Sequence, residues 1–153
     1  MAISNEIRVD FPSLSVNEAF ARMVISAFIL PLDPTVEELA DVKTAVSEAV
    51  TNAIVHGYPE RRGTVRMHAF IYDNCSLRID VIDNGCGIAD IERARQPFYS
   101  TLSHEERSGM GFTIIESFMD NTQIISEPGK GTTIRMSKQL GAQSMELKDV
   151  REG

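Results

Sequence analysis

The sequence is poor in several features that mark particular classes of protein. Its 153 residues include only two cysteines, Cys75 and Cys86, and their spacing is not CxxC. Such a pair predicts neither a disulfide framework nor a zinc site, and it fits a reducing compartment. No apolar run approaches the roughly 20 residues that span a bilayer, and no basic segment followed by an apolar core opens the chain. We therefore expect a cytoplasmic protein.

Positive charge is also scarce. The 15 Lys and Arg residues are outnumbered by 22 Asp and Glu residues, and the formal net charge is −7. A nucleic-acid-binding surface needs clustered Lys and Arg to neutralise phosphates, so we expect no direct binding of nucleic acid and no membrane partner. A single nucleotide is compatible with this charge, because a few backbone amides and one cation can hold its phosphates.

The length fits one domain, which we place at residues 1–140, followed by a flexible tail over residues 141–153. The apolar pattern predicts a strand, two helices, a strand hairpin, an irregular segment that reads as a functional loop or lid, a helix and a second hairpin. Strands joined by hairpins indicate an α+β sandwich, with helices on one face of a mixed, mainly antiparallel sheet. The predicted ranges are 4–12, 16–29, 36–56, 64–73 with 76–83, 84–111, 111–120 and 122–140.

Local sequence also predicts how the helices begin, end and pack. Ser15 with Glu18, and Thr35 with Glu38, have the spacing of capping boxes. Gly57 is placed to end the second helix as the residue after its C-cap. In the first helix, recurring apolar residues predict a buried face made of Phe20, Met23, Val24, Ala27 and Phe28.

Glu48 and Asn52 lie in SEAVTNAIVHGY, a run that is otherwise almost entirely apolar. Polar side chains at such places cost free energy unless something satisfies them. Being four residues apart, the two share one face of the predicted helix. There an Asn carbonyl would suit Mg²⁺, and a Glu could accept a proton from a hydroxyl or water. Taken alone, the pair is also explained by capping or bridging of backbone groups.

The stretch DVIDNGCGI places Asp83 at the end of a predicted strand, before Gly85 and Gly87, which allow close approach of the backbone to a ligand. The carboxylate could accept a hydrogen bond from an exocyclic amine such as that of adenine. In GKGTTI, the hydroxyl of Thr133 would lie beside Asp83 if the two strands are neighbours. A simple Asn-Gly turn and a glycine-rich hairpin turn are the alternatives.

The stretch RSGMGF contains Arg107, Gly109, Met110 and Gly111 immediately before a predicted helix. Backbone amides at a helix N-terminus form an anion site suited to a polyphosphate, and Arg107 could reach the same anion. The lone GxG lacks the GxGxxG spacing of a dinucleotide fingerprint. The P-loop pattern and the HRD and DFG signatures of eukaryotic-type protein kinases are absent from the sequence.

In this order and at these intervals, Glu48 to Asn52, DNGCG, GMGF and GKGTT resemble the ATP-binding signature of the GHKL superfamily. That superfamily includes gyrase-type topoisomerases, heat-shock chaperones, mismatch-repair proteins and histidine kinases, and its fold is the Bergerat-type sandwich. The resemblance covers residues 7–138. It implies that Asn52 holds Mg²⁺ and Glu48 is the general base. It also implies that Asp83, with Gly85 and Gly87, holds adenine, and that the GMG glycines and Met110 hold phosphates.

Three segments are similar in sequence to one branch of this superfamily, the bacterial anti-sigma factor serine kinases that act in sporulation. They are FPSLSVNEAFAR, VSEAVTNAIVHGY and RSGMGF. The resemblance implies a homodimer that binds ATP or ADP with Mg²⁺ and holds a sigma factor away from RNA polymerase. It also implies phosphorylation of a serine on an anti-anti-sigma protein, with Arg107 neutralising the transferred phosphoryl group. Arg22 resembles an arginine of that family that contacts both protein partners, and a solvated helix arginine is the alternative reading.

Two other functions stay open at this point. One is a nucleotide-gated module that binds a sigma factor with little phosphoryl transfer, and the intact Glu48 argues against it. The other is a stand-alone ATPase, which a lid as short as residues 96–110 argues against. A labelled protein product in the presence of ATP and Mg²⁺ would separate the kinase from both.

Overall fold

The strands form one sheet whose order differs from their order along the chain. The computed structural model describes residues 1–95 and 111–141. Within those ranges, every neighbouring pair of strands is antiparallel, in the order β1-β2-β3-β5-β4. The mixed character that the sequence suggested is therefore not seen there. The strands are β1 (Ile3–Pro12), β2 (Thr64–Tyr72), β3 (Ser76–Asp83), β4 (Asn121–Glu127) and β5 (Gly131–Gln139).

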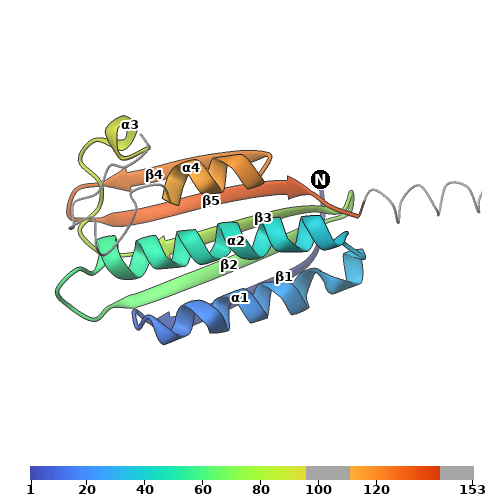
Figure 1. The fold of residues 1–153 in the computed structure, drawn as a ribbon, viewed down its shortest axis with the longest axis horizontal. Coiled ribbons are helices and arrows are strands. Elements are labelled where there is room, and N and C mark those ends of the chain that lie inside the picture. The colour runs from blue at the N-terminus through green and yellow to red at the C-terminus, as the bar shows by residue number, and fades with distance from the viewer. Residues whose placement is uncertain (96–110, 142–153) are drawn as a thin grey trace, which may run out of the picture.

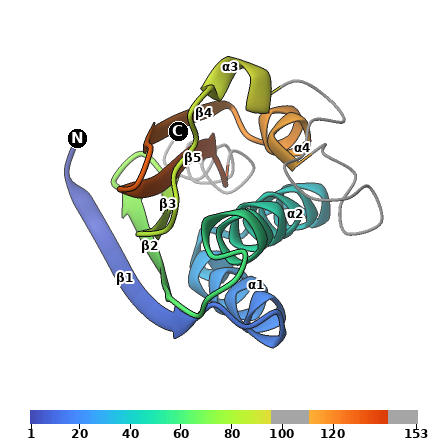
Figure 2. The same ribbon diagram turned by 90° about the vertical axis from the view of Figure 1, so that its left-hand side faces the viewer.

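Helices cover one face of this sheet, as the sequence predicted, and in the described residues the other face carries none (Figures 1 and 2). Helix α2 lies between α1 and α4 and packs against both. A short 3₁₀ turn, η1, follows α1, and a π-helical turn, η2, continues α2. No helix in the described ranges is both long and apolar enough to span a bilayer. The helices are α1 (Val16–Ile29), η1 (Leu30–Leu32), α2 (Val36–Asn52), η2 (Ala53–Gly57), α3 (Ile91–Ala94) and α4 (Gly111–Phe118).

The core lies between the sheet and the helices, because successive strand residues point to opposite faces. Inward positions on β2 and β3 are apolar and buried, and the outward positions beside them carry charged and aromatic side chains. The inward residues are Val65, Met67, Ala69, Leu77, Ile79 and Val81. This alternation confirms the predicted strands and leaves the last residue of β3, Asp83, on the helix side.

One of the two predicted capping boxes is present. At the start of α2, the Glu38 N–H donates to Thr35 Oγ1 at 3.0 Å, and the Thr35 N–H donates to Glu38 Oε1 at 2.9 Å. At the start of α1 the prediction is wrong, because Ser15 has helical dihedral angles and its side chain makes no cap hydrogen bond. Glu18 instead accepts a hydrogen bond from the hydroxyl of Ser47 on α2. A contact with a distant part of the chain has replaced the local one.

The predicted buried face of α1 is also largely wrong. Phe20 and Met23 are 52% and 67% exposed, and the residues of α1 that reach the core are Ala21, Ile25, Phe28 and Ile29. Apolar residues occur on both sides of this helix, so its period fits two faces and only packing on α2 and the sheet decides between them.

Candidate functional site

Polar groups converge where α2 and β3 end at the same edge of the sheet. Asp83 is the last residue of β3 and is only 3% exposed. A Cβ added to Gly57, the last residue of η2, would lie 2.7 Å from Asp83 Cγ and 2.8 Å from its Oδ1. Only a residue without a side chain can occupy position 57 against this carboxylate. The prediction that Gly57 follows the C-cap is wrong, because Gly57 is the last residue of η2 and Tyr58 is its C-cap.

The carboxylate of Asp83 is buried and accepts hydrogen bonds from the backbone. Burial raises its pKa above the ordinary value, and backbone hydrogen bonds from Gly85 and Thr132 partly oppose that rise. The Gly85 N–H donates to Asp83 Oδ1 at 2.9 Å. A carboxylate has about four acceptor positions, so this one keeps capacity for a ligand donor. A buried acceptor of this kind suits a neutral amine such as the exocyclic amine of adenine.

The DNGCG loop after Asp83 is fastened to both sides of this edge. The Cys86 N–H donates to the Gly57 carbonyl at 3.0 Å, and the Gly129 N–H in the β4–β5 turn donates to the Cys86 carbonyl at 2.8 Å. A Cβ on Gly85 would meet the Gly57 carbonyl oxygen at 1.9 Å, and Gly87 has φ +73°. The glycines predicted for close backbone approach are thus required by packing of the loop on its own protein.

Glu48 and Asn52 lie on the side of α2 that faces away from α1. Ser47 fixes the orientation of the helix, because its hydroxyl contacts Glu18 on α1. At about 100° per residue, Glu48 and Asn52 are turned away from that contact, and Figure 2 shows α4 on α2's other flank. Asn52 is 8% exposed. A largely buried amide of this kind suits a cation or a hydrogen bond from a ligand.

The helical turn that follows Asn52 is unusual. After Asn52 the helix widens into the π-helical η2, from Ala53 to Gly57. Wide turns of this type are frequent at functional sites. Here the turn brings Gly57 against Asp83 and exposes the His56 carbonyl to the Cys86 thiol, which donates to it at 3.0 Å. Nothing in the sequence pattern distinguished this turn from an ordinary helix end.

The predicted phosphate-binding segment is described only in part. Gly111 is the buried first residue of α4, which packs against α2. Arg107, Gly109 and Met110 lie outside the described residues. Within residues 1–95 and 111–141, no group of three His, Cys, Asp or Glu side chains is arranged to hold a metal ion.

Thr133 is misplaced by one residue in the sequence-based prediction. In the register of β3 and β5, Thr132 is opposite Asp83 and Thr133 is opposite Ile82. Because directly opposite residues share a face of a sheet, Thr132 lies on the helix side with Asp83, and Thr133 lies on the other face. Thr132 is 5% exposed, and its hydroxyl is 2.8 Å from Ser126 Oγ. Sequence reasoning missed Thr132 because adjacent threonines cannot be told apart without the register.

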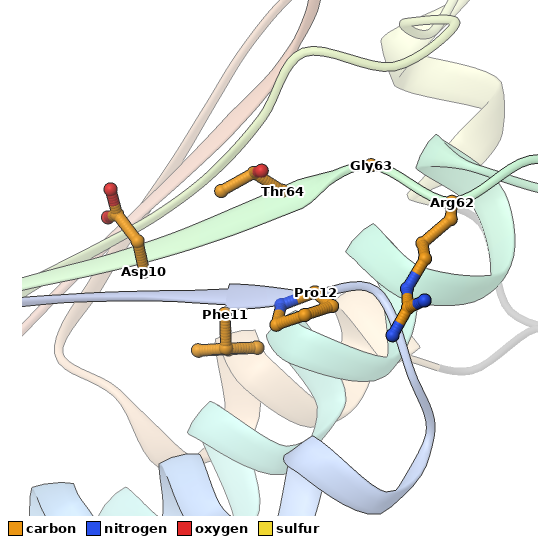
Figure 3. A pocket seen from close by; sticks show the side chains of 6 residues that line it. All are labelled: Asp10, Phe11, Pro12, Arg62, Gly63 and Thr64. Carbon is orange, nitrogen blue, oxygen red and sulfur yellow. The ribbon is translucent and has the colours of Figure 1, made fainter.

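Two surface hollows lie near the sheet ends, and neither is the helix-side site. A hollow of about 330 Å³ is lined by Asp83 and Thr132 but also by Ile82, Ile125 and Thr133, which place it on the helix-free side. A second hollow, of about 370 Å³, lies where β1 ends beside the start of β2 (Figure 3). Its lining residues are Asp10, Phe11, Pro12, Arg62, Gly63 and Thr64. The packing of Gly57 on Asp83 locates the candidate site better than either volume does.

Arg22 lies apart from these groups, at the border of α1 and α2. Its Nη1 is 3.3 Å from Glu18 Oε1 and 3.5 Å from Ser47 Oγ, and its side chain is 41% exposed. It faces the opposite flank of α2 from Asn52. The structure therefore separates the predicted partner-contacting residue from the predicted nucleotide contacts.

Comparisons with known proteins identify the family of the chain. Residues 11–138 match the family model described as the histidine kinase-like ATPase domain. The chain is 53% identical over 142 residues to the anti-sigma F factor of Thermoanaerobacter sp. (strain X514), covering 93% of this chain and 99% of that protein. It is 50% identical over 139 residues to the anti-sigma F factor of Bacillus subtilis (strain 168), covering 90% and 94%.

A solved structure of the RsbU and RsbW domains of a Mycobacterium tuberculosis protein is similar in fold, with a TM-score of 0.64 at 18% identity. The match covers 90% of this chain and 33% of that one. A blue-light activated histidine kinase of Erythrobacter litoralis matches with a TM-score of 0.58 at 24% identity, covering 74% of this chain and 34% of that one. At these identities the two structures support the fold alone.

Proposed function

Because the chain belongs to the histidine kinase-like ATPase family, we propose that it is an ATP-dependent anti-sigma factor. It sequesters a sigma factor and phosphorylates a serine of an anti-anti-sigma protein. The observation that carries the nucleotide part is the buried Asp83 carboxylate held against Gly57. Support for the sigma-factor part comes from relatives named anti-sigma F factor at 50–53% identity over almost their whole length. A sporulation role follows from the same resemblance.

Asp83 recognises adenine in this proposal. The buried carboxylate accepts a hydrogen bond from the exocyclic amine, and Gly57 leaves room for the carboxylate to face the base. Thr132, beside Asp83 in the sheet, adds a hydroxyl on the same face. Because a guanine ring has a carbonyl oxygen where adenine has its amine, this arrangement discriminates against guanine nucleotides.

The phosphates lie toward α2 and α4. Bound with Mg²⁺, ATP supplies the phosphoryl group that is transferred. Asn52 presents a hard amide oxygen of the kind that Mg²⁺ takes among phosphate and water ligands. The backbone amides at Gly109 and Gly111, together with Arg107, neutralise negative charge on the phosphates.

Glu48, one turn from Asn52, accepts the proton of the attacking serine hydroxyl. Positioning and electrostatic stabilisation supply most of the acceleration in phosphoryl transfer, and a positioned base adds about 10²–10⁴-fold. Arg22, on the other flank of α2, contacts the protein partners without entering the nucleotide site. We also propose that the protein acts as a homodimer, which light scattering of the purified chain would test.

A phosphorylation assay tests the enzyme proposal. The purified protein is incubated with labelled ATP, Mg²⁺ and the anti-anti-sigma protein encoded by its host, and the label is followed on protein serine and as free phosphate. The wild type should label the antagonist. Phosphate release into water without a labelled protein would favour an ATPase, and sigma-factor retention without either product would favour a nucleotide-gated binding module.

Glu48→Gln tests the base within that assay. The variant should bind ATP as the wild type does and transfer phosphoryl about 100-fold more slowly or worse. Glu37→Gln, which removes an exposed carboxylate from the first turn of the same helix, is the matched control and should transfer at the wild-type rate. Full-rate transfer by Glu48→Gln would remove the general-base assignment.

A further inference from the structure

Arg95 connects two segments of the protein. It lies on the segment that follows Asp83, and it contacts α4, the helix that begins at Gly111. Its Nε donates to Glu116 Oε1 of α4 at 2.6 Å. Its backbone carbonyl accepts from the hydroxyl of Thr113, one turn earlier on the same helix, at 3.3 Å. Two contacts one turn apart fix both the position of α4 and its rotation about its own axis.

Helix α4 depends on such contacts because it is short. It has 8 residues, well below the length at which an isolated helix is stable in water. Phe112 and Ile115 anchor one of its faces in the core. Thr113 and Glu116 lie on the remaining surface, and they meet Arg95. The direction of the backbone N–H groups in the first turn of α4 follows from this pair of anchors.

The other end of the connection is rigid. Ile88, which follows the glycine loop, donates its N–H to Ser126 Oγ at 2.7 Å. Asp90 caps α3 by accepting from the Arg93 N–H at 3.1 Å. From Asp83 to Arg95 the backbone is therefore tied to β4, to the β4–β5 turn and to η2. The contact of Arg95 with Glu116 connects this segment to α4 and so fixes the position of α4 relative to Asp83.

We propose that Arg95 and Glu116 are positioning residues for the polyphosphate. Their ion pair holds the N-terminus of α4 at the separation from Asp83 that adenine and its phosphates must span. The proposal rests on the proposed function, in which Asp83 holds adenine and the α4 end holds phosphates. On this proposal, the contribution of the pair to binding affinity increases with the number of phosphates on the ligand.

Breaking the ion pair should change the free energy of unfolding only slightly. A change in ligand affinity can therefore be separated from a loss of folding. The side chains of Arg95 and Glu116 are 34% and 37% exposed, and half-exposed ion pairs contribute little to folding. Glu116→Gln should therefore fold as the wild type does. Glu92 also lies 3.9 Å from Arg95 but is 89% exposed and outside α4, so Glu92→Gln is the matched control.

Calorimetric titration with adenosine, ADP and ATP, each with Mg²⁺, tests the proposal. Glu116→Gln should bind adenosine as the wild type does and bind ATP about two- to fivefold more weakly, which is within the range that an exposed ion pair can supply. ADP should fall between them, and Glu92→Gln should match the wild type throughout. The double variant R95E/E116R should recover ATP affinity.

Each contrary result has its own meaning. Equal weakening of adenosine, ADP and ATP in Glu116→Gln, or unchanged affinity for all three, overturns the positioning role while the nucleotide site stands. If the wild type binds none of the three ligands, the proposed function falls and this role falls with it.

Discussion

Replacing Gly57 by alanine tests the packing at the centre of the site. In an ordinary helical position the change would stabilise the protein by about 0.5–1 kcal/mol, because glycine loses more backbone entropy on folding. Here the new methyl group would lie 2.7 Å from Asp83 Cγ, 2.8 Å from Oδ1 and 3.0 Å from Oδ2. All three separations are too short for carbon against a carboxylate.

The carboxylate has little freedom to withdraw. Asp83 is 3% exposed, and its side chain is held by backbone donors at Gly85 and Thr132. Overpacking of this kind costs about 1–3 kcal/mol. Set against the helical gain, the expected net loss is about 1 kcal/mol, or about 2–4 °C in melting temperature for a chain of this size. Displacing a charged acceptor by an ångström should also weaken ATP binding about tenfold to a hundredfold.

Thermal unfolding and calorimetric titration with ATP measure the two effects on Gly57→Ala. Gly129→Ala is the control. Its Cβ would meet nothing within 4 Å, but its φ of +78° strains any side chain, so it should lose about 1 kcal/mol and keep its ATP affinity. If Gly57→Ala were as stable as the wild type and bound ATP equally well, the close packing of Gly57 on Asp83 would be refuted.

The two buried aspartates of β3 should respond to pH in opposite ways. Burial raises the pKa of Asp83, so ionisation of this group destabilises the fold as pH rises through the raised pKa. In urea unfolding, the free energy of unfolding of Asp83→Asn should therefore fall less than that of the wild type as pH rises above about 4, and the variant should bind no ATP. Parallel pH curves for the two proteins would contradict this. Burial also raises the pKa of Asp80, but hydrogen bonds from Arg78 and Arg135 outweigh it and hold the pKa below its ordinary value. Asp80→Asn should cost about 2 kcal/mol at neutral pH, since it leaves two partly exposed guanidiniums unpaired, with the difference from wild type closing below about pH 4. Because Asp80 lies on the helix-free face, ATP affinity should not change, and a change would show that the two faces are coupled.

The sequence predicted elements well where the evidence for them was local. The bounds of α1 and the Thr35 capping box depend on side chains within a few residues, and both are as predicted. The capping box at Ser15 fails because Glu18 is engaged by Ser47, 29 residues away. No local pattern contains that information.

The candidate site was predictable in its motifs and not in its geometry. Asp83 was singled out as the end of a strand, but the role of Gly57 depends on two elements meeting in space. The one-residue error at Thr133 has a related cause, since the face that a strand residue occupies follows from the register. The open-face cluster of Arg78, Asp80 and Arg135 joins residues 55 apart and could not be read from either strand alone.

The central claim is that the Asp83 end of the sheet recognises the adenine of ATP. Calorimetric titration of the wild-type protein with ATP and with GTP, under the same Mg²⁺ concentration, tests it most directly. The account predicts that ATP binds and that GTP binds at least about a hundredfold more weakly, because guanine presents an acceptor to the Asp83 carboxylate where adenine presents a donor. Equal affinity for the two nucleotides, or no binding of ATP, would contradict it.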